Sequence, residues 1–218
     1  MIKILLIVLL IILYLSKRES FSNEIDPNNI ITFNSVNYKD RIEKTKELIL
    51  DLKLKKGSKI LDIGGKQFND FCDKNNYKYY CIDLHQSQQT GTGGYNKADY
   101  CASYDGRNLP YKKNEFDLVI VNFVLHHAAH NTLYLLNQIA NITSKYVIIG
   151  EDLSELNYDM RWHTRNFEHQ PGGMFRSDEE WKTLFKFYNL KLIKQYNIKR
   201  KDDFTKDIHR CMYILKKK

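Results

Sequence analysis

The sequence predicts an α/β domain in which a doubly wound, mostly parallel seven-stranded sheet carries helices on both faces. Two observations lead to this fold class. Short apolar runs alternate with segments of helical periodicity, and the most apolar run, residues 117–125, is β-branched without alternation. A strand that is apolar on both faces is typical of a parallel sheet between two layers of helices. The chain has 218 residues, enough for one such domain and too few for two large ones.

The elements can be placed in order along the chain. Helices are expected where apolar residues recur three and four positions apart, at 38–54, at 132–142 and from 178 onward. The last of these begins with a capping box, with Ser177 as the N-cap and Glu180 at the third helical position. The expected strands are 59–63, 77–84, 117–125, 146–150, 190–198 and 208–215.

A run of twelve apolar residues, 4–15, lies near the amino terminus. As a helix it would be about 18 Å long, shorter than the ~30 Å hydrocarbon core of a bilayer. Residues 1–18 are therefore expected to be an N-terminal membrane anchor or a secretory signal, and the lack of a clear A-x-A cleavage site favours the anchor. Basic residues on its two sides nearly balance, so both orientations stay open. Residues 19–37 are polar and are expected to tether this segment to a folded domain at 38–218.

Composition and charge narrow the functional classes. With 43% hydrophobic and 28% charged residues, the chain is neither disordered nor a polytopic membrane protein. The net charge is +8, and residues 191–218 carry ten Lys or Arg against three Asp. We interpret these lysines as solvated positions on edge strands and expect no nucleic-acid partner. None of the four cysteines forms a CxxC pair, so neither a disulfide scaffold nor a structural zinc site is expected, and the thiols indicate a reducing compartment.

Candidate binding residues follow the strands, because ligands of parallel α/β sheets bind beyond the carboxyl ends of the strands. The first strand ends in a glycine turn at Gly64 and Gly65, which would let a ligand approach the backbone closely. The second ends at Asp83, 21 residues after Asp62, where an acceptor-only carboxylate suits the two hydroxyls of a ribose. Asp105, after the third, could accept a hydrogen bond from an exocyclic amine such as that of adenine. The alternatives are an ordinary tight turn and aspartates that cap the following loops.

The order and spacing of these motifs resemble the class I S-adenosylmethionine-dependent methyltransferases, in particular the methyltransferase type 11-like group. The resemblance is carried by ILDIGG at 60–65, CIDL at 81–84, DGRNLPY at 105–111, FDLVI at 116–120 and VLHH at 124–127. It implies a Rossmann-like fold and S-adenosyl-L-methionine as the cofactor. It further implies that the glycine turn faces the methionine part, Asp83 the ribose, Asp105 and Gly106 the adenine, and the backbone at Asn122 the sulfonium. The cofactor-binding residues implied are Asp62, Ile63, Gly64, Gly65, Asp83, Leu84, Asp105, Gly106 and Asn122.

Two departures from the family pattern support a second hypothesis. Lys66 and Phe68 stand where the family has its second and third glycines, and residues 85–97 resemble a loop where a helix is usual. A side chain at these positions would crowd the cofactor, which suggests a catalytically inactive methyltransferase-like binding module tethered to a membrane. A dinucleotide-binding oxidoreductase is disfavoured because the turn lacks G-x-G-x-x-G.

Methyl transfer depends mainly on positioning, but a base helps when the acceptor is a hydroxyl or an amine. We expect that catalytic base among His127, at the exit of the central strand, and His163 and His169, in the segment after the fifth strand. For His127 the ordinary alternative is a structural histidine bonded to a backbone carbonyl. His126 and His130 are four residues apart, but a strand exit does not favour metal geometry, and no metal is expected.

The sequence therefore predicts a membrane-anchored, S-adenosylmethionine-dependent methyltransferase. Its catalytic domain is expected to face the cytosol, where the cofactor is made. The acceptor, a small molecule, a lipid or a protein, is not identified by the sequence, nor is the oligomeric state. A hydrophobic acceptor would predict a pocket lined by Trp162, Phe167, Met174 and Phe175.

Overall fold

One eight-stranded sheet organises the protein in a computed structural model, which describes residues 27–35, 38–84, 101–153, 174–200 and 210–218. The strand order is β1-β7-β8-β6-β5-β2-β3-β4, and every neighbouring pair is parallel except the two that β8 makes. The strands are β1 (Ile30–Ser35), β2 (Lys59–Ile63), β3 (Lys78–Leu84), β4 (Ala102–Tyr104), β5 (Phe116–Asn122), β6 (Thr143–Asp152), β7 (Leu190–Arg200) and β8 (Arg210–Lys217). The predicted α/β fold class is confirmed, with one strand more than expected.

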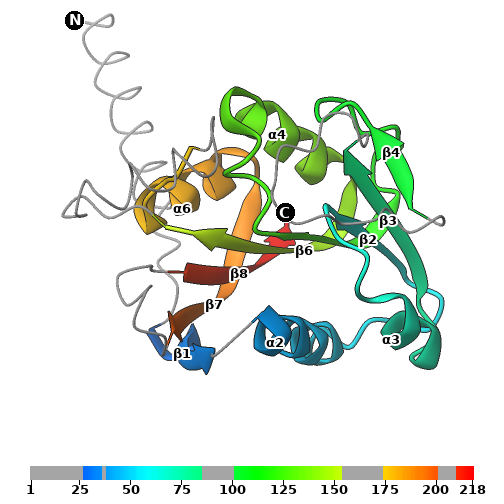
Figure 1. The fold of residues 1–218 in the computed structure, drawn as a ribbon, viewed down its shortest axis with the longest axis horizontal. Coiled ribbons are helices and arrows are strands. Elements are labelled where there is room, and N and C mark those ends of the chain that lie inside the picture. Colours follow the sequence, from blue (N-terminus) through cyan, green and yellow to red (C-terminus); the bar gives the residue numbers. More distant parts are fainter. Residues whose placement is uncertain (1–26, 36–37, 85–100, 154–173, 201–209) are drawn as a thin grey trace, which may run out of the picture.

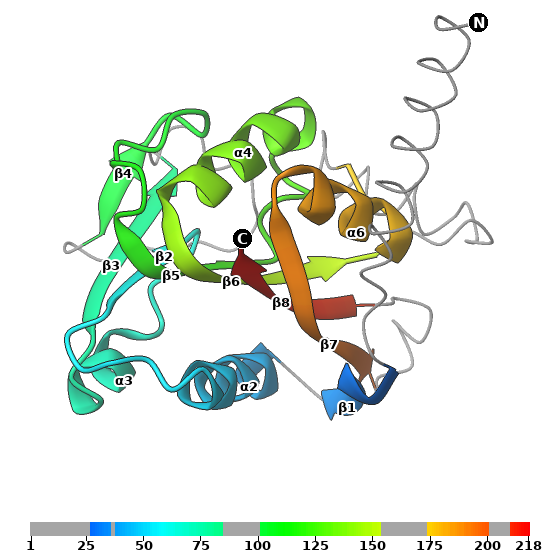
Figure 2. The ribbon, with the colours of Figure 1, turned by 180° about the vertical axis from the view of Figure 1, so that it is seen from behind.

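Helices cover the two faces of this sheet (Figures 1 and 2). They are α2 (Tyr38–Asp51), α3 (Asn69–Lys74), α4 (Thr132–Ile142) and α6 (Asp178–Phe187), with 3₁₀ turns η1 (Pro27–Asn29) and η3 (Ala129–Asn131). The helices α4 and α6 lie above the sheet in Figure 1, and α2 and α3 lie below it. The predicted capping box is present: the Ser177 hydroxyl accepts the Glu180 N–H at 3.2 Å, and the Glu180 carboxylate accepts the Ser177 N–H at 2.7 Å.

The sheet separates two hydrophobic cores because side chains alternate along each strand. On β5, Val119 and Val121 pack in the upper core with residues of α4 and α6, while Leu118 and Ile120 pack in the lower core with residues of α2 and α3. All four are fully buried. Burial on both faces explains the unbroken apolar sequence of β5, and the packing holds the carboxyl end of the strand in place.

The edge strand β1 corrects the predicted domain boundary. Residues 30–35 were expected to belong to the polar tether, but they pair in parallel with β7, Ile30 opposite Gln195 and Ser35 opposite Arg200. The segment has no clear alternation of apolar and polar residues, and Ile30 and Ile31 are exposed. Its order comes from backbone bonds to a strand far along the chain, which no local pattern reveals.

A disulfide joins Cys81 on β3 to Cys101, the residue before β4, with the two Cα atoms 4.8 Å apart. The expectation of reduced thiols is wrong for this pair, because the parallel pairing of β3 and β4 brings together cysteines that are distant in sequence. Cys72 and Cys211 are free and buried, and burial raises the pKa of each thiol to about 12.

In the part of the chain that the structure describes, no helix combines the length and the apolar character needed to cross a bilayer. The predicted anchor at 1–18 and the predicted loop at 85–97 both lie outside the described residues.

Candidate active site

The glycine turn after β2 has the geometry that only glycine allows. Gly64 has φ +74°, and its N–H donates to the carbonyl of Ile82 on the neighbouring strand at 2.8 Å. A Cβ at Gly64 would lie 2.5 Å from a methyl carbon of Val124, which follows β5. The turn is therefore pressed between the ends of β3 and β5, and its backbone is exposed at the sheet edge, as the sequence predicted.

Asp62 lies directly beneath this turn and is 2% exposed. Its carboxylate accepts the Tyr79 hydroxyl at 2.9 Å, and a Cβ at Gly65 would lie 2.4 Å from it. Burial raises the pKa of Asp62 to about 7, against the opposing effects of hydrogen bonds from Tyr79 and the Gln67 backbone. The buried side chain thus supports the turn from below.

Phe68 does not project toward the turn's open side. Its ring is 1% exposed and packs in the lower core with Ile60, Cys72 and Ile120. The backbone then enters α3 at Asn69. The bulky residue in the place of a family glycine is therefore explained by a core position, so one of the two side chains expected to crowd the cofactor lies elsewhere.

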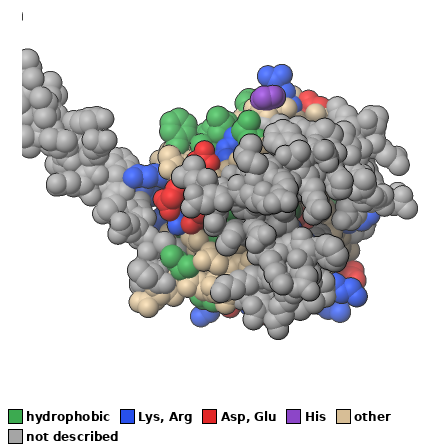
Figure 3. Space-filling view, turned by 60° about the vertical axis from the view of Figure 1, so that its left-hand side comes forward, with side chains coloured by type: hydrophobic (Ala, Val, Ile, Leu, Met, Phe, Trp, Pro, Cys, Tyr) green, Lys and Arg blue, Asp and Glu red, His purple; other side chains and the backbone are tan. Residues whose placement is uncertain are grey.

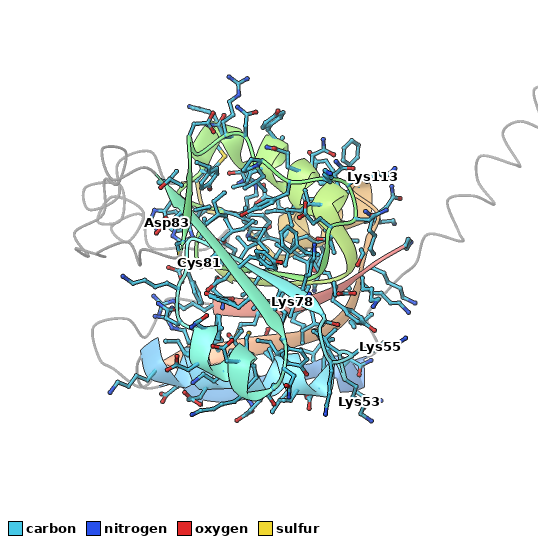
Figure 4. All side chains as sticks on the ribbon, turned by 90° about the vertical axis from the view of Figure 1, so that its right-hand side faces the viewer. Lys53, Lys55, Lys78, Cys81, Asp83 and Lys113 are labelled. Carbon is cyan, nitrogen blue, oxygen red and sulfur yellow. A yellow bond between two sulfur atoms is a disulfide. The ribbon has the colours of Figure 1, made fainter. Side chains whose placement is uncertain are left out.

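Asp83 and Leu84 end β3 beside the turn, and Figure 4 shows Asp83 near the tip of that strand. The carboxylate of Asp83 is half-buried and accepts the N–H of Leu84 at 2.7 Å through one oxygen. Tyr104, on the adjacent strand, has its pKa raised to about 12 by burial and by the negative charges of Asp83 and Asp105. The two carboxylates therefore lie at the same edge, around one tyrosine.

Asp105 forms a turn of its own. It is exposed, and its carboxylate accepts the N–H of Arg107 at 2.8 Å, the N–H of Asn108 at 2.7 Å and the Asn108 side-chain amide at 2.9 Å. These bonds lower its pKa to about 2. Gly106, at φ +75°, lies so close to Leu84 that a Cβ would be 2.8 Å from its methyl carbon. The alternative of a loop-forming aspartate describes Asp105 well, and the turn's backbone is what approaches β3.

The exit of β5 carries Asn122 to the same edge. Its side-chain amide donates to the Thr45 hydroxyl of α2 at 3.1 Å, and its buried carbonyl oxygen has no partner. Phe123 then takes φ +59° and donates its N–H to the Gly150 carbonyl at 2.7 Å. The side chain of Asn122 is thus committed to α2, and only its backbone remains for the predicted role.

His126, four residues after the end of β5, forms a buried pair with Glu151 of β6. The sequence did not predict this pair. The Nδ1 atom of His126 is 2.6 Å from one Glu151 oxygen, and the other oxygen accepts the Leu125 N–H at 2.8 Å. Burial lowers the pKa of His126, but the charge and hydrogen bond of Glu151 outweigh it and raise the pKa overall. The parallel register of β5 and β6, with Asn122 opposite Gly150, brings the two together. The signal was present as a histidine and an acid following adjacent strand ends.

His127, the predicted base, is on the outer side of this pair. It is exposed, and its ring centroid is 4.0 Å from that of His126. Partial burial of the imidazole and the positive charge of His126 together lower its pKa to about 4. His127 is therefore neutral near pH 7. His163 and His169 lie outside the described residues, and among the described residues no group of three His, Cys, Asp or Glu could hold a metal ion.

The chain returns to this edge at residue 174. The N–H of Met174 donates to the His126 carbonyl at 2.8 Å, and the Phe175 ring stacks on the His126 ring at 5.0 Å. Arg176 has one buried guanidinium nitrogen without a partner, and burial lowers its pKa. Met174 and Phe175 belong to the predicted hydrophobic pocket, whereas Trp162 and Phe167 are not described. On the face in Figure 3, exposed hydrophobic side chains gather along one rim, with a histidine beside them.

Comparisons with known proteins agree with this geometry. A family model described as a methyltransferase domain matches residues 37–195. No curated protein is similar enough to match. Many solved structures share the fold. One is described as the complex between the Haloferax volcanii Trm112 methyltransferase activator and the putative methyltransferase. It has 17% identity and a TM-score of 0.61, and the match covers 82% of this chain and 91% of that one.

Two further structures show the same fold. A putative sarcosine dimethylglycine methyltransferase from Galdieria sulphuraria has 13% identity and a TM-score of 0.63, with coverage of 81% and 85% of the two chains. Magnesium protoporphyrin IX methyltransferase from Synechocystis, solved with bound S-adenosylhomocysteine, has 11% identity and a TM-score of 0.57, with coverage of 84% and 89%.

The edge suits the cofactor of such a domain. Gly64 and Gly106 lie in turns where a Cβ would clash with Val124 and Leu84, and between them Asp83 has a second carboxylate oxygen that accepts no hydrogen bond from the described residues. An acceptor-only group beside exposed backbone matches a nucleoside with a free diol.

Proposed function

Because the chain belongs to the methyltransferase-domain family, with S-adenosylmethionine as the family's cofactor, we propose that it is an active, membrane-anchored methyltransferase. The observation that carries the proposal is the alignment of three strand ends. The order β5-β2-β3-β4 sets the Gly64 turn, the Asp83 carboxylate and the Gly106 turn side by side at one edge. Both glycines are also required by packing against Val124 and Leu84, so the half-buried Asp83 carboxylate between them is the feature that favours an active enzyme over a scaffold.

The bound cofactor would supply a methyl group activated on a sulfonium. The chain's own residues would position it: Asp83 would accept hydrogen bonds from the ribose hydroxyls, and the Gly64 turn would lie against the methionine part. Positioning and exclusion of water account for much of the rate in such a displacement. The buried His126–Glu151 pair would hold the β5 exit rigid, because it bonds both the side chain and the backbone of that segment.

His127 is the described side chain best placed to assist the acceptor. A neutral imidazole can accept a hydrogen bond from the O–H or N–H of an acceptor and orient its lone pair. With a pKa of about 4, however, it would hold a proton only weakly near pH 7. We therefore assign His127 the role of orienting the acceptor, and water takes up the proton that the acceptor releases.

The acceptor class follows from the surroundings of His126. Phe175 stacks on its ring and Met174 is 39% exposed beside it, so this side of the edge is apolar. Arg176 adds a partly buried positive charge close to Glu151. An acceptor with an apolar body fits this combination. The sequence-based alternative of an inactive module rested on Lys66 and Phe68, and the burial of Phe68 in the core weakens it.

The membrane location rests on the apolar run at 4–15, and the cytosolic orientation on the supply of cofactor. The Cys81–Cys101 disulfide favours the opposite, since disulfides rarely persist in the cytosol. Counting thiols in cells decides the matter: acid quenching, then alkylation under denaturing conditions, should label four cysteines if the domain is cytosolic. Labelling of Cys72 and Cys211 alone would contradict that orientation.

Activity is tested by label transfer. The full chain in mild detergent is incubated with methyl-labelled S-adenosylmethionine and an extract of cells that lack the protein, and the lipid, protein and small-molecule fractions are counted. We expect label in one fraction, and Asp83→Ala should lower that labelling when the cofactor is below saturation. Cofactor binding without transfer to any fraction would support the inactive module. The absence of both binding and transfer would rule out both hypotheses.

A further inference from the structure

The edge of the sheet opposite the candidate active site carries a continuous row of unpaired lysines. Nine are exposed, and within the described part of the chain none of their side chains makes an ion pair or hydrogen bond. They are Lys53, Lys55, Lys56, Lys78, Lys112, Lys113, Lys191, Lys216 and Lys218. We name this set the lysine edge.

The strand register makes the row continuous. Lys78 begins β3 and lies beside Lys59 of β2, and Lys191, the second residue of β7, lies opposite Lys216 of β8. Between them, Lys217 donates to Asn114 in the turn before β5, at 2.7 Å. Figure 4 shows β3 lengthwise, with Lys53, Lys55, Lys78 and Lys113 toward its amino end and Asp83 at its other end. The remaining members lie in the connections before β2 and β5, which adjoin the amino ends of these strands, or at the carboxyl end of the antiparallel β8.

Acidic residues do not neutralise the row. The two at the start of β5, Glu115 and Asp117, already pair with Lys59 and Lys145, at 3.8 Å and 2.6 Å. Two lysines are close enough to repel each other. Burial lowers the pKa of Lys217, and the positive charge of Lys113 lowers it further. Unpaired like charges repel and cost stability, so their persistence in one row points to an anionic partner outside the chain.

One exposed aromatic side chain stands at the end of this row. Phe187 closes α6 and is 75% exposed, with its ring 5.1 Å from that of Tyr188. The backbone N–H of Lys218 donates to the Asn189 carbonyl at 3.0 Å, which ties this turn to the lysine edge. An apolar ring among lysines suits a bilayer surface, where the ring enters the interface and the ammonium groups meet lipid phosphates.

We propose that the lysine edge docks on a membrane surface rich in anionic phospholipid, so that the candidate active site faces away from the bilayer. Nucleic acid is the other polyanion to weigh, but the geometry does not favour it as a substrate. From Lys78 to Asp83, β3 spans about 17 Å at ~3.3 Å per residue. A nucleic-acid strand bound along the lysine edge would therefore not reach the candidate active site. The apolar run at 4–15 supplies a second membrane signal in the same chain, and two signals together give stable attachment.

The test uses the full chain and co-sedimentation with vesicles of phosphatidylcholine alone or with 30% phosphatidylserine. The triple substitution Lys55→Gln, Lys78→Gln and Lys113→Gln removes three charges from the lysine edge. The matched control, Lys44→Gln, Lys46→Gln and Lys182→Gln, removes three charges from ion-paired positions on α2 and α6. Thermal unfolding of both variants checks that the fold is intact, which the lack of partners of the first set favours.

We expect the wild-type chain to bind the anionic vesicles more tightly, with the difference lost at 0.5 M salt. The lysine-edge variant should bind them 10- to 100-fold more weakly and bind neutral vesicles as before, whereas the control should change less than twofold. Phe187→Ser should weaken binding to both kinds of vesicle. Equal binding of the wild type to both vesicles, equal losses in the two triple variants, or a lysine-edge variant that loses only RNA binding would each overturn the proposal.

Discussion

The two edges of the sheet treat charge in opposite ways. At the carboxyl edge the ionisable groups are buried or engaged: Asp62 lies under a turn, His126 pairs with Glu151, and Asp105 binds its own loop. At the amino edge, the nine lysines of the lysine edge are exposed and have no partner among the described residues. Desolvated, bonded charges fix a backbone in one geometry, which a small ligand requires. Solvated charges adapt to a broad surface. The difference separates a site that recognises shape from one that recognises charge.

The largest effect is expected at Glu151. Replacing it with alanine would leave the His126 imidazolium buried without its counter-charge and the Leu125 N–H without an acceptor. We expect the free energy of unfolding at pH 6 to fall by about 3–5 kcal/mol, measured by urea denaturation. Glu151→Gln keeps an acceptor and should lose less, while NMR titration shows the pKa of His126 falling. Unchanged stability in Glu151→Ala would mean that the pair does not hold this edge.

The buried Asp62 should make stability depend on pH. Its folded-state pKa of about 7 exceeds the ordinary 3.8, so the folded state binds a proton that the unfolded state releases. Rising pH therefore favours unfolding between about 4 and 7, by roughly 4 kcal/mol in total. His126, with a raised pKa, acts in the same direction above 6.5. The lowered pKa of His127 acts in the opposite direction between about 4 and 6.5, so the test is the difference between two proteins. As the pH rises from 4 to 7, we expect Asp62→Asn to gain stability relative to the wild type in chemical denaturation; a constant difference between the two proteins would contradict this account.

The glycine turn gives a smaller, controlled difference. Gly64 and Gly57 both have positive φ, but a Cβ at Gly57 would meet nothing within 4 Å. Alanine at Gly57 should cost only the backbone strain, about 1–2 kcal/mol. Alanine at Gly64 should cost about 1–2 kcal/mol more because of Val124, and should also abolish cofactor binding. Equal costs in thermal or urea unfolding would show that the turn is not pressed against β5.

Local sequence patterns were sufficient to predict the helices and strands whose packing is local. The helix at 132–142 and the strand at 59–63 have the bounds that periodicity predicted, and the box at Ser177 has the predicted bonds. Fold class and family followed from the order of these elements. The eighth strand did not, because an edge segment without clear alternation of apolar and polar residues is recognisable only by its partner strand.

The site was predicted in position more than in detail. Sequence placed Gly64, Asp83 and Gly106 at one edge, where they are found. It could not show that the Asp105 carboxylate accepts hydrogen bonds from its own loop, or that His126 rather than His127 is buried against Glu151. Both outcomes depend on side-chain direction and on contacts across strands. The disulfide was missed for the same reason.

The central claim is that the carboxyl edge holds a nucleoside cofactor through Asp83. Isothermal titration of the full chain with S-adenosylhomocysteine tests it, using the wild type, Asp83→Ala, and Asp70→Ala as a control on the exposed face of α3. We expect the wild type and Asp70→Ala to bind alike and Asp83→Ala to bind about 1–3 kcal/mol more weakly. Equal affinity in all three proteins, or no heat of binding in the wild type, would contradict the account.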